Sequence, residues 1–361
     1  MNRIISVETR IVDTPLLTGI KTTYGSWNCQ PHVIVRITTE DGTSGLGESS
    51  PLEFFTGESP DMVKMVIERI LTAVLIGKDP FDLEALLLAM DHRLPKQGSS
   101  KSGVDGALHD LLGKLLGIPV YRYLGGRCRE GLVTAATAVG IDTPDKMREE
   151  ARQWVEKGFR TLKLKIGVDP KTDEESIEAV RDAVGKEIRI RVDANQGYSS
   201  STAIQVAKSV EKYGIEYIEQ PVPAWDIEGM ARVRRATAIP VAADESLYTL
   251  HDAMQLIRAE AVDVFGIKFI KTGGLARAKK IAHLAEAAGI ECVVISPLET
   301  TLGTAAGAHW ALSVPNANLD HELVGPLFIH DDCFEGMEIV ERSIEVSDRP
   351  GVGISLKKNL F

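Results

Sequence analysis

Three acidic residues follow three apolar runs at almost equal intervals along the chain. Asp193 lies in RIRVDANQ, Glu219 in IEYIEQP and Asp244 in IPVAADES. The intervals, 219 − 193 = 26 and 244 − 219 = 25 residues, match the length of a repeat made of one strand, one helix and two short loops. If each run is a strand of a parallel barrel, the three carboxylates meet at its C-terminal mouth. Oxygen ligands that converge there suit Mg²⁺, so the spacing predicts a metal enzyme.

Three lysines lie on strand-like runs that flank these carboxylates. Lys163 and Lys165 alternate in TLKLKIG, so both side chains face the same side of a strand. A neighbouring like charge and burial are the conditions that adapt a lysine to general-base work at neutral pH. Taken alone, the pair is more typical of a solvated strand face, because lysine is mostly exposed. Lys268 supports the interpretation that these two lysines face the barrel interior. It ends the sixth strand-like run, which would lie opposite the second.

This layout fits the removal of a proton from the carbon beside a carboxylate. Mg²⁺ and a cationic lysine would stabilise the enediolate that forms. One lysine could take the proton, and the other could return it from the opposite face. The residues therefore predict an enzyme that acts on a small-molecule carboxylate.

Alternating strand and helix patterns supply the elements that would position these residues. From about residue 132 the chain contains eight strand-like runs, over 133–139, 161–167, 188–194, 215–221, 239–245, 263–269, 291–297 and 317–323. Helical patterns separate them, over 143–157, 172–184, 200–213, 226–235, 250–259, 274–288 and 302–312. Such alternation implies parallel strands, and eight of them favour a closed barrel. The alternative, an open doubly wound sheet, is disfavoured because no Gly-rich phosphate loop follows residue 139.

The residues before and after this repeat predict a second unit. Strand-like runs at the start of the chain are separated by a turn at Asp41-Gly42, and helical patterns follow over 60–76, 80–93 and 101–117. The last residues leave the repeat, and we expect them to return to the N-terminal unit. The predicted fold is therefore α/β, a (β/α)7β modified TIM barrel over residues 131–325. An α+β capping domain would comprise residues 1–130 and the C-terminal segment 326–361.

Composition narrows the class of protein. The chain has 361 residues, of which 44% are hydrophobic and 25% charged, as in globular proteins with a large core. The net charge of −10 and the lack of basic clusters argue against nucleic acid as a partner. Four scattered cysteines indicate reduced thiols rather than a disulfide framework. With no long apolar span and no signal pattern, we expect a cytoplasmic protein without a membrane partner.

Five short motifs together resemble the enolase superfamily, in its muconate-lactonising subgroup. They are LKLKIG at 162–167, VDANQG at 192–197, IEQP at 218–221, ADES at 243–246 and IKFIKTGG at 267–274. The resemblance implies that Asp193, Glu219 and Asp244 bind Mg²⁺, with Mn²⁺ as an alternative. It implies that Lys165 and Lys268 are the acid/base pair.

The same resemblance implies roles for the neighbouring residues. Lys163 would neutralise the substrate carboxylate and tune Lys165, while Asn195 and Glu245 would orient the metal ligands from behind. The mandelate-racemase branch is disfavoured, because it has a His-Asp dyad where this chain has Lys268. Assembly into a homo-oligomer is a further expectation from the resemblance.

The residues that would select the substrate resemble two different groups of enzymes. Two lid segments, 19–27 with Tyr24 and 51–57, and Thr137 at the end of the first barrel strand are candidate contacts. So are Asp320 and Glu322 in LDHELVGPL. That stretch departs from the Asp-x-Asp of dipeptide epimerases and resembles the Glu-Leu-Phe-Gly-Pro of muconate cycloisomerases. The KTGG stretch, in contrast, resembles the epimerases.

The sequence thus predicts a Mg²⁺-dependent isomerase that removes the α-proton of a small carboxylate. A racemase or epimerase of an amino-acid derivative or dipeptide is the first expectation, because a lysine on each face fits 1,1-proton transfer. A muconate-type cycloisomerase is the main alternative, and a dehydratase or N-succinylamino-acid chemistry would use the same groups. A non-catalytic carboxylate-binding protein is disfavoured, since an idle site has no reason to hold so many buried charges together.

Overall fold

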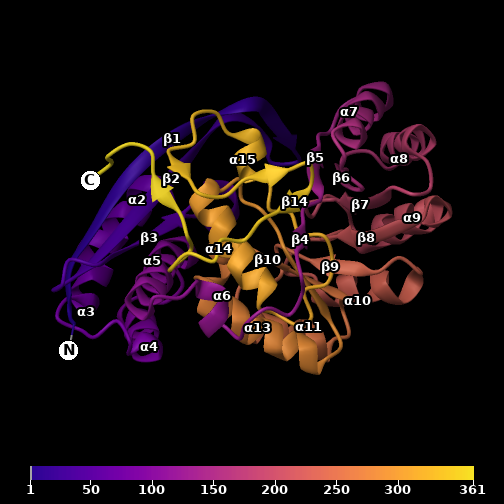
Figure 1. Cartoon of the computed structure of the whole chain (residues 1–361). Coiled ribbons are helices and arrows are strands. Elements are labelled where there is room, and N and C mark those ends of the chain that lie inside the picture. The colour runs from indigo at the N-terminus through magenta and orange to yellow at the C-terminus, as the bar shows by residue number, and fades with distance from the viewer. Residues whose placement is uncertain (1) are drawn as a thin grey trace.

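The computed structural model describes residues 2–361, apart from the side chains of residues 137 and 138. Figure 1 shows two parts, a barrel with its outer helices and a smaller sheet-and-helix unit beside it. The predicted α/β class with a capping unit is confirmed.

The barrel is a parallel sheet whose strands follow chain order. They are β5 (Ala136–Val139), β6 (Thr161–Lys165), β7 (Arg189–Asp193), β8 (Ile215–Glu219), β9 (Val241–Ala243), β10 (Val264–Ile267) and β11 (Glu291–Val294). The side chains of β6, β7, β8 and β10 are almost entirely buried, which explains why these runs read as continuous apolar stretches.

The eighth predicted strand is reduced to a two-residue ladder that closes the barrel. His321 bridges Thr134 on one side, and Glu322 bridges Ile295 on the other. Just before this ladder, the carbonyl of Asp320 accepts a hydrogen bond from the Arg191 side chain at 2.7 Å.

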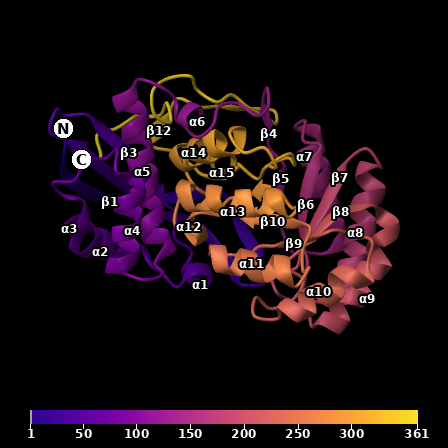
Figure 2. The same ribbon diagram turned by 90° about the horizontal axis from the view of Figure 1, so that it is seen from below.

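Helices cover the outside of the barrel, as predicted (Figure 2). They are α7 (Pro144–Glu156), α8 (Pro170–Val184), α9 (Ser200–Val210) with the 3₁₀ turn η2 (Glu211–Tyr213), α10 (Ile227–Ala236), α11 (Leu250–Arg258), α13 (Leu275–Ala287) and α14 (Thr301–Leu312). One short helix was not predicted: α12 (Phe269–Thr272) begins immediately after Lys268.

The capping unit packs an antiparallel sheet against helices. The strands are β1 (Ile4–Thr22), β2 (Gly25–Thr39) and β3 (Ser44–Ser49). The helices are α1 (Glu53–Thr56), α2 (Pro60–Val66), the π-helical turn η1 (Ile67–Leu71), α3 (Thr72–Leu75), α4 (Leu83–Arg93), α5 (Gly98–Leu116) and α6 (Val120–Tyr123). Strand β3 lies directly on α5, since a Cβ on Gly47 would be 2.1 Å from the carbonyl oxygen of Gly103.

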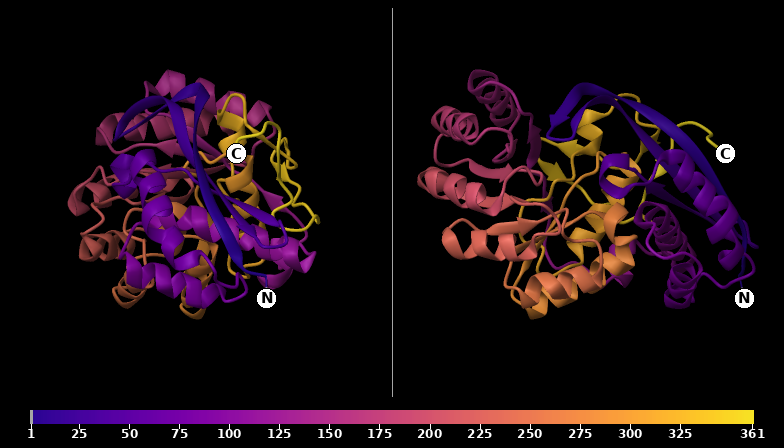
Figure 3. Two further views of the ribbon diagram at one scale, coloured as in Figure 1. Left: turned by 90° about the vertical axis from the view of Figure 1, so that its left-hand side faces the viewer. Right: turned by 180° about the vertical axis from the view of Figure 1, so that it is seen from behind.

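Strands β1 and β2 form a long hairpin that reaches from the capping unit to the barrel (Figures 1 and 3). Its tip lies between Thr22 and Gly25, and Gly25 adopts φ +125° there. The first predicted lid segment is therefore a hairpin tip carried on two strands, and Tyr24 is at its turn.

The C-terminal segment contacts both parts of the molecule. It begins with α15 (Gly325–Phe328) and contains β12 (Phe334–Glu335), β13 (Ile339–Val340), β14 (Ser343–Ile344) and β15 (Ser355–Leu356). Strand β14 pairs with β4 (Leu132–Val133) at the start of the barrel. The Val120 amide in the capping unit donates to the carbonyl of Gly351, and the Phe361 ring lies 4.3 Å below the Arg36 guanidinium carbon.

Carboxylates of the capping unit hold the N-termini of two barrel helices. Glu48 on β3 accepts hydrogen bonds from the amides of Thr300 (2.8 Å) and Gly303 (2.9 Å) at the start of α14. It also pairs with His32 at 2.8 Å and is fully buried. Asp105 on α5 accepts from the Leu275 amide of α13 at 2.6 Å. An acid at a helix N-terminus is stabilising, so these contacts tie the two units together.

We predict that Glu48→Gln lowers the free energy of unfolding by about 3 kcal/mol, because it replaces a buried carboxylate that accepts from Ser50 and Thr300 and weakens a helix cap. Urea unfolding measures this loss. The matched control is Glu8→Gln, which removes a partly exposed pair with Arg36 and should cost less than about 1 kcal/mol. Equal losses in the two variants would contradict the assignment.

The contribution of Glu48 to the free energy of unfolding should depend on pH. Burial alone would raise the pKa of Glu48, but His32, Ser50 and Thr300 outweigh it and lower the pKa to about 2. A carboxyl with a depressed native pKa stabilises the fold above its unfolded pKa, and that stability is lost as pH falls toward the native pKa. The difference between the wild-type protein and Glu48→Gln should therefore shrink between about pH 5 and pH 2.

Candidate active site

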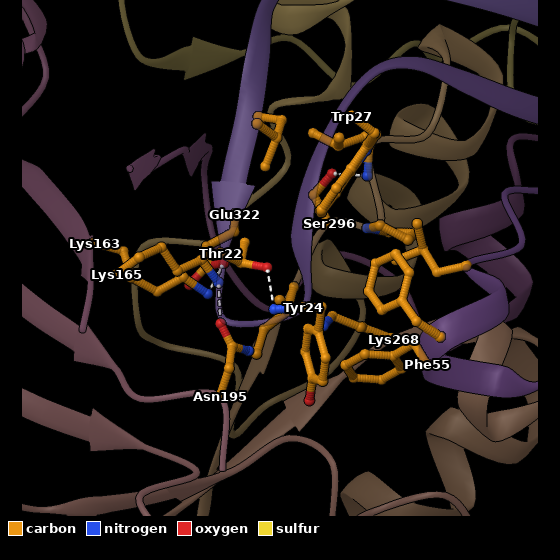
Figure 4. A pocket seen from close by; sticks show the side chains of 16 residues that line it. Thr22, Tyr24, Trp27, Phe55, Lys163, Lys165, Asn195, Lys268, Ser296 and Glu322 are labelled. Atoms are coloured by element: carbon orange, nitrogen blue, oxygen red, sulfur yellow. Dashed lines mark hydrogen bonds and ion pairs between the residues drawn. The ribbon is translucent and has the colours of Figure 1, made fainter. Parts of the chain in front are cut away.

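A cavity lies between the barrel mouth and the tip of the β1–β2 hairpin. Lys163, Lys165, Lys268 and Glu322 line it from the barrel side, as Figure 4 shows. Aromatic and aliphatic side chains line it from the capping unit: Ile20, Tyr24, Trp27, Leu52, Phe54 and Phe55. The barrel side of the cavity, its floor, thus carries charged residues, and the capping-unit side, its roof, is largely apolar.

The strand register places the acidic residues at the C-terminal ends of neighbouring strands. Lys165, Asp193 and Glu219 are register partners across β6, β7 and β8, and Asp244 follows the end of β9. Asp193, Glu219 and Asp244 are all fully buried. The even spacing in the sequence therefore corresponds to one row of carboxylates at the barrel mouth.

An ammonium group lies against each of these carboxylates. Lys165 Nζ is 2.5 Å from Asp193 Oδ2 and 3.1 Å from Asn195 Oδ1. Lys268 Nζ is 2.6 Å from Asp244 Oδ2. Figure 4 shows Lys165 and Lys268 on opposite sides of the cavity.

Lys163 bridges three acids below the cavity. Its Nζ is 2.5 Å from Glu322 Oε2, 3.2 Å from Glu219 Oε2 and 3.6 Å from Asp193 Oδ2. Glu322 in turn accepts a hydrogen bond from the Tyr217 hydroxyl at 3.3 Å and lies 3.9 Å from Arg191. Lys163 and Glu322 therefore form a buried ion pair inside the barrel.

A second group of polar residues connects the barrel mouth to the hairpin tip. Asn195 Nδ2 donates to Glu245 Oε1 at 3.0 Å. The Tyr24 hydroxyl donates to the same Glu245 oxygen at 2.7 Å and accepts from Gln196 Nε2 at 2.7 Å. Asn195 and Gln196 both have positive φ, a backbone conformation that turns the chain sharply behind Asp193. Tyr24 thus lines the cavity and also joins the hairpin to the barrel through hydrogen bonds to Glu245 and Gln196, a contact called the latch below.

Two predicted substrate contacts are not part of this group. Asp320 does not line the described cavity: its Oδ2 accepts from the Thr161 hydroxyl at 2.7 Å and pairs with Arg189. Thr161 and Arg189 begin β6 and β7, so Asp320 lies at the opposite, N-terminal end of the barrel, and we withdraw it as a substrate contact. The side chain of Thr137 lies outside the described part of the chain.

Sequence reasoning missed Lys271, and it named Phe55 only as part of the lid segment 51–57. Lys271 is fully buried, and its Nζ donates to Asp244 Oδ1 at 2.6 Å and to the Gly266 carbonyl at 3.1 Å. The short helix α12 brings it back under the strand end, and only its spacing of three residues from Lys268 signals this. The Phe55 ring covers Lys268, with the ring centroid 4.0 Å from Nζ.

The pKa values of the acids shift in different directions, because burial and neighbouring acids raise some of them and neighbouring lysines lower another. Burial raises the pKa of Glu219 well above its ordinary value, and the charge of Asp193 adds to the effect. Burial and the charge of Asp244 raise the pKa of Glu245 to about 7. For Asp244, burial is outweighed by Lys268 and Lys271, which hold its pKa below the ordinary range.

The ammonium groups respond to the same surroundings. Burial alone would lower the pKa of Lys163, but Glu219, Glu322 and Asp193 raise it well above its ordinary value. For Lys268, Asp244 and Glu245 outweigh burial and raise the pKa. Burial lowers the pKa of Lys271. Lys163 and Lys268 are therefore held as cations among the carboxylates.

The donor set suits a hard divalent cation. It consists of buried carboxylate oxygens, and Glu245 Oε2 is buried without a hydrogen-bond partner among the described residues. In the arrangement described for residues 2–361, no group of three or more His, Cys, Asp or Glu side chains could hold a metal ion by itself. Lysine Nζ atoms lie against the same carboxylate oxygens, so a metal ion there would have to displace ammonium contacts.

A parallel barrel with carboxylates on successive strand ends, lysines on both sides and a separate cap defines a class of enzymes that act on carboxylates beside an acidic C–H bond. The chain belongs to the mandelate racemase/muconate lactonizing enzyme family. Residues 4–125 match the N-terminal domain of that family, and residues 146–360 match the enolase C-terminal domain-like family. The resemblance inferred from five short motifs is confirmed.

Curated relatives cover the chain almost end to end. The L-Ala-D/L-Glu epimerase of Bacillus subtilis is 37% identical, over 98% of this chain and 96% of the relative. The N-succinyl-L-Arg/Lys racemase of Bacillus cereus is 36% identical, over 99% and 96%. Muconate cycloisomerase 1 of Rhodococcus opacus is 33% identical, over 98% and 96%. All three are isomerases, so the prediction of an isomerase is confirmed.

Solved structures agree over nearly the whole chain. A substrate-liganded complex of the B. subtilis epimerase has a TM-score of 0.95 at 37% identity and covers 98% of both chains. A dipeptide epimerase of Enterococcus faecalis, solved with Mg and the dipeptide L-Leu-L-Tyr, has a TM-score of 0.94 at 33% identity, covering 98% of this chain and 99% of that one. None of the helices described for residues 2–361 is both long and apolar enough to cross a bilayer.

We predict that Tyr24→Phe loosens the hairpin tip without unfolding the protein. Losing a hydrogen bond of this kind costs about 1.5 kcal/mol, roughly tenfold in an opening equilibrium. Amide hydrogen exchange over residues 17–27 should quicken by about that factor, while exchange in α4 serves as the internal control. Unchanged exchange at the tip would contradict the latch.

Proposed function

We propose that the protein is a Mg²⁺-dependent racemase or epimerase of an amino-acid derivative. In this proposal, Lys165 removes the α-proton from one face of the substrate and Lys268 supplies a proton to the other. The reverse reaction exchanges the two roles. The placement of the two lysines on opposite sides of one cavity is the observation that carries the proposal.

The buried row of Asp193, Glu219 and Asp244 supports Mg²⁺ as the cofactor. When bound, Mg²⁺ would hold the substrate carboxylate and stabilise the negative charge that develops on its oxygens. Asn195 and Glu245 would orient the acids from behind. Lys163, fixed by Glu219 and Glu322, would add positive charge beneath the carboxylate.

The cavity favours a substrate whose amino group is acylated and uncharged. A free ammonium group needs a carboxylate partner, and Glu322 is the sole acid among the described residues that line the cavity. Glu322 is already bound to Lys163, so an added ammonium group would compete with that pair. The apolar roof, with Trp27 and Phe54, favours an apolar side chain or acyl group. An N-acylamino acid fits better than a free dipeptide on this ground.

A muconate-type cycloisomerase is the second candidate. The stretch from Glu322 to Pro326 resembles that of muconate cycloisomerases, and relatives of that activity are similar over the whole chain. The same lysines and acids would serve the lactonising reaction. A homo-oligomeric state, a cytoplasmic location and activity with Mn²⁺ remain predictions.

Incubation in D₂O tests the proposal. With Mg²⁺, we expect α-deuteration of N-succinyl and N-acetyl amino acids with apolar side chains, measured by mass spectrometry, and slower labelling of free dipeptides. Removal of the metal with EDTA should stop labelling, and added Mg²⁺ should restore it. No labelling of any amino-acid derivative, together with lactone formation from cis,cis-muconate, would favour the second candidate.

Variants that lack one lysine test proton transfer on each face of the substrate separately. Lys165→Ala and Lys268→Ala should each lower racemisation by about 10²- to 10⁴-fold, because a general acid–base group typically contributes a factor in this range. Each variant should still exchange the α-proton of one enantiomer, and the two variants should prefer opposite enantiomers. If both variants racemise at the wild-type rate, the two-lysine mechanism is wrong.

A further inference from the structure

Lys268 lies between an acid of the barrel and an aromatic ring of the capping unit. Its Nζ is 2.6 Å from Asp244 Oδ2 and 4.0 Å from the centroid of the Phe55 ring. The lysine is 7% exposed. The face of an aromatic ring attracts an ammonium group, most strongly where water is excluded, so this contact fixes where the ammonium lies.

Phe55 is itself held in place by contacts on both sides. It lies on α1, where its carbonyl accepts a hydrogen bond from the Tyr248 hydroxyl at 2.8 Å, and the two rings stack at 6.4 Å. The adjacent Thr56 hydroxyl accepts from Ser99 on α5 at 3.1 Å. Glu58, two residues further on, caps α5 by accepting from the Ser99 amide at 2.8 Å. The ring position is therefore set jointly by the capping unit and the barrel.

Lys165 is held in a different way. Its contacts are Asp193 and Asn195, both carried by the barrel. None of the cation–π contacts found among the described residues involves Lys165. The direct polar contacts of Lys165 thus come from the barrel, whereas Lys268 also has a direct contact with a ring of the lid.

We infer that Phe55 is a positioning residue for Lys268, and that the lid thereby controls proton transfer on one face of the substrate. The inference rests on the proposed two-lysine function. In that step, the electron pair of the enediolate forms the new C–H bond with a proton of Lys268, which is left as a neutral amine. The Phe55 ring, 4.0 Å from Nζ, keeps the ammonium at the edge of the cavity and directed toward it before the transfer.

The test measures exchange in backgrounds where only one lysine works. Phe55→Leu is combined with Lys165→Ala, which leaves Lys268, and with Lys268→Ala, which leaves Lys165. Both double variants are assayed with Mg²⁺ in D₂O, using the enantiomers of the N-acylamino acid labelled fastest by the wild-type protein. We expect the slowing caused by Phe55→Leu to be about tenfold greater in the Lys165→Ala background, which corresponds to about 1.4 kcal/mol.

Matched variants separate positioning from general damage to the lid. Phe54→Leu changes the neighbouring ring on α1, which stacks on Tyr24 at 5.0 Å, and should slow exchange by similar factors in both backgrounds. Phe55→Tyr keeps the ring and should restore the Lys268-dependent rate. If Phe55→Leu is unstable by thermal unfolding, Phe55→Met should give the same ratio, because it also removes the ring and keeps an apolar side chain.

The outcomes distinguish this inference from the proposed function. Equal slowing by Phe55→Leu in both backgrounds means that Phe55 serves the cavity as a whole, and overturns the inference while the two-lysine function stands. If the wild-type protein labels no N-acylamino acid or dipeptide, the proposed function fails, and the inference that rests on it fails as well.

Discussion

The barrel mouth can hold its buried carboxylates only because ammonium groups lie between them. An isolated buried charge is costly, and removing one partner of a buried pair leaves the other uncompensated. Asp193, Glu219 and Asp244 are fully buried, and each contacts a lysine. The strand register, the short helix α12 and the Glu322 ladder all act to bring one sign of charge against the other. The same lysines and carboxylates are the groups to which the proposed function assigns the chemistry.

The capping unit completes this arrangement from above. The hairpin tip reaches Glu245 through Tyr24, and α1 reaches Lys268 through Phe55. In the opposite direction, Glu48 and Asp105 hold the first turns of two barrel helices. The charged residues that line the cavity belong to the barrel, and most of its aromatic lining belongs to the capping unit, so the proposed function assigns the reaction and the choice of substrate to different parts of the chain.

Much of this could be predicted from the sequence, because the β/α repeat fixes where each strand ends. The near-equal spacing of Asp193, Glu219 and Asp244 identified their common row, and Lys268 resolved the ambiguity of the two lysines on β6. Asp320 could not be assigned in the same way. A strand rises about 3.3 Å per residue. Asp320 precedes Glu322 by two residues, and this offset is enough to place Asp320 at the base of the barrel while Glu322 lines the cavity. Lys271 was missed because a four-residue helix has too short a pattern to be recognised.

The contact of the C-terminal segment with α5 has a consequence for the order of folding. Asp110 on α5 accepts hydrogen bonds from the amide of Leu46 on β3 at 2.8 Å and from the amide of Val352 at 2.9 Å. The capping unit leaves the ribosome first, yet Oδ1 of this buried acid gains its Val352 donor only after more than two hundred further residues have been translated. Domains generally fold as units in the order of synthesis. Here the cap can become fully native only once the chain beyond the barrel has been made, so completion of the lid is delayed until the barrel beneath it is present.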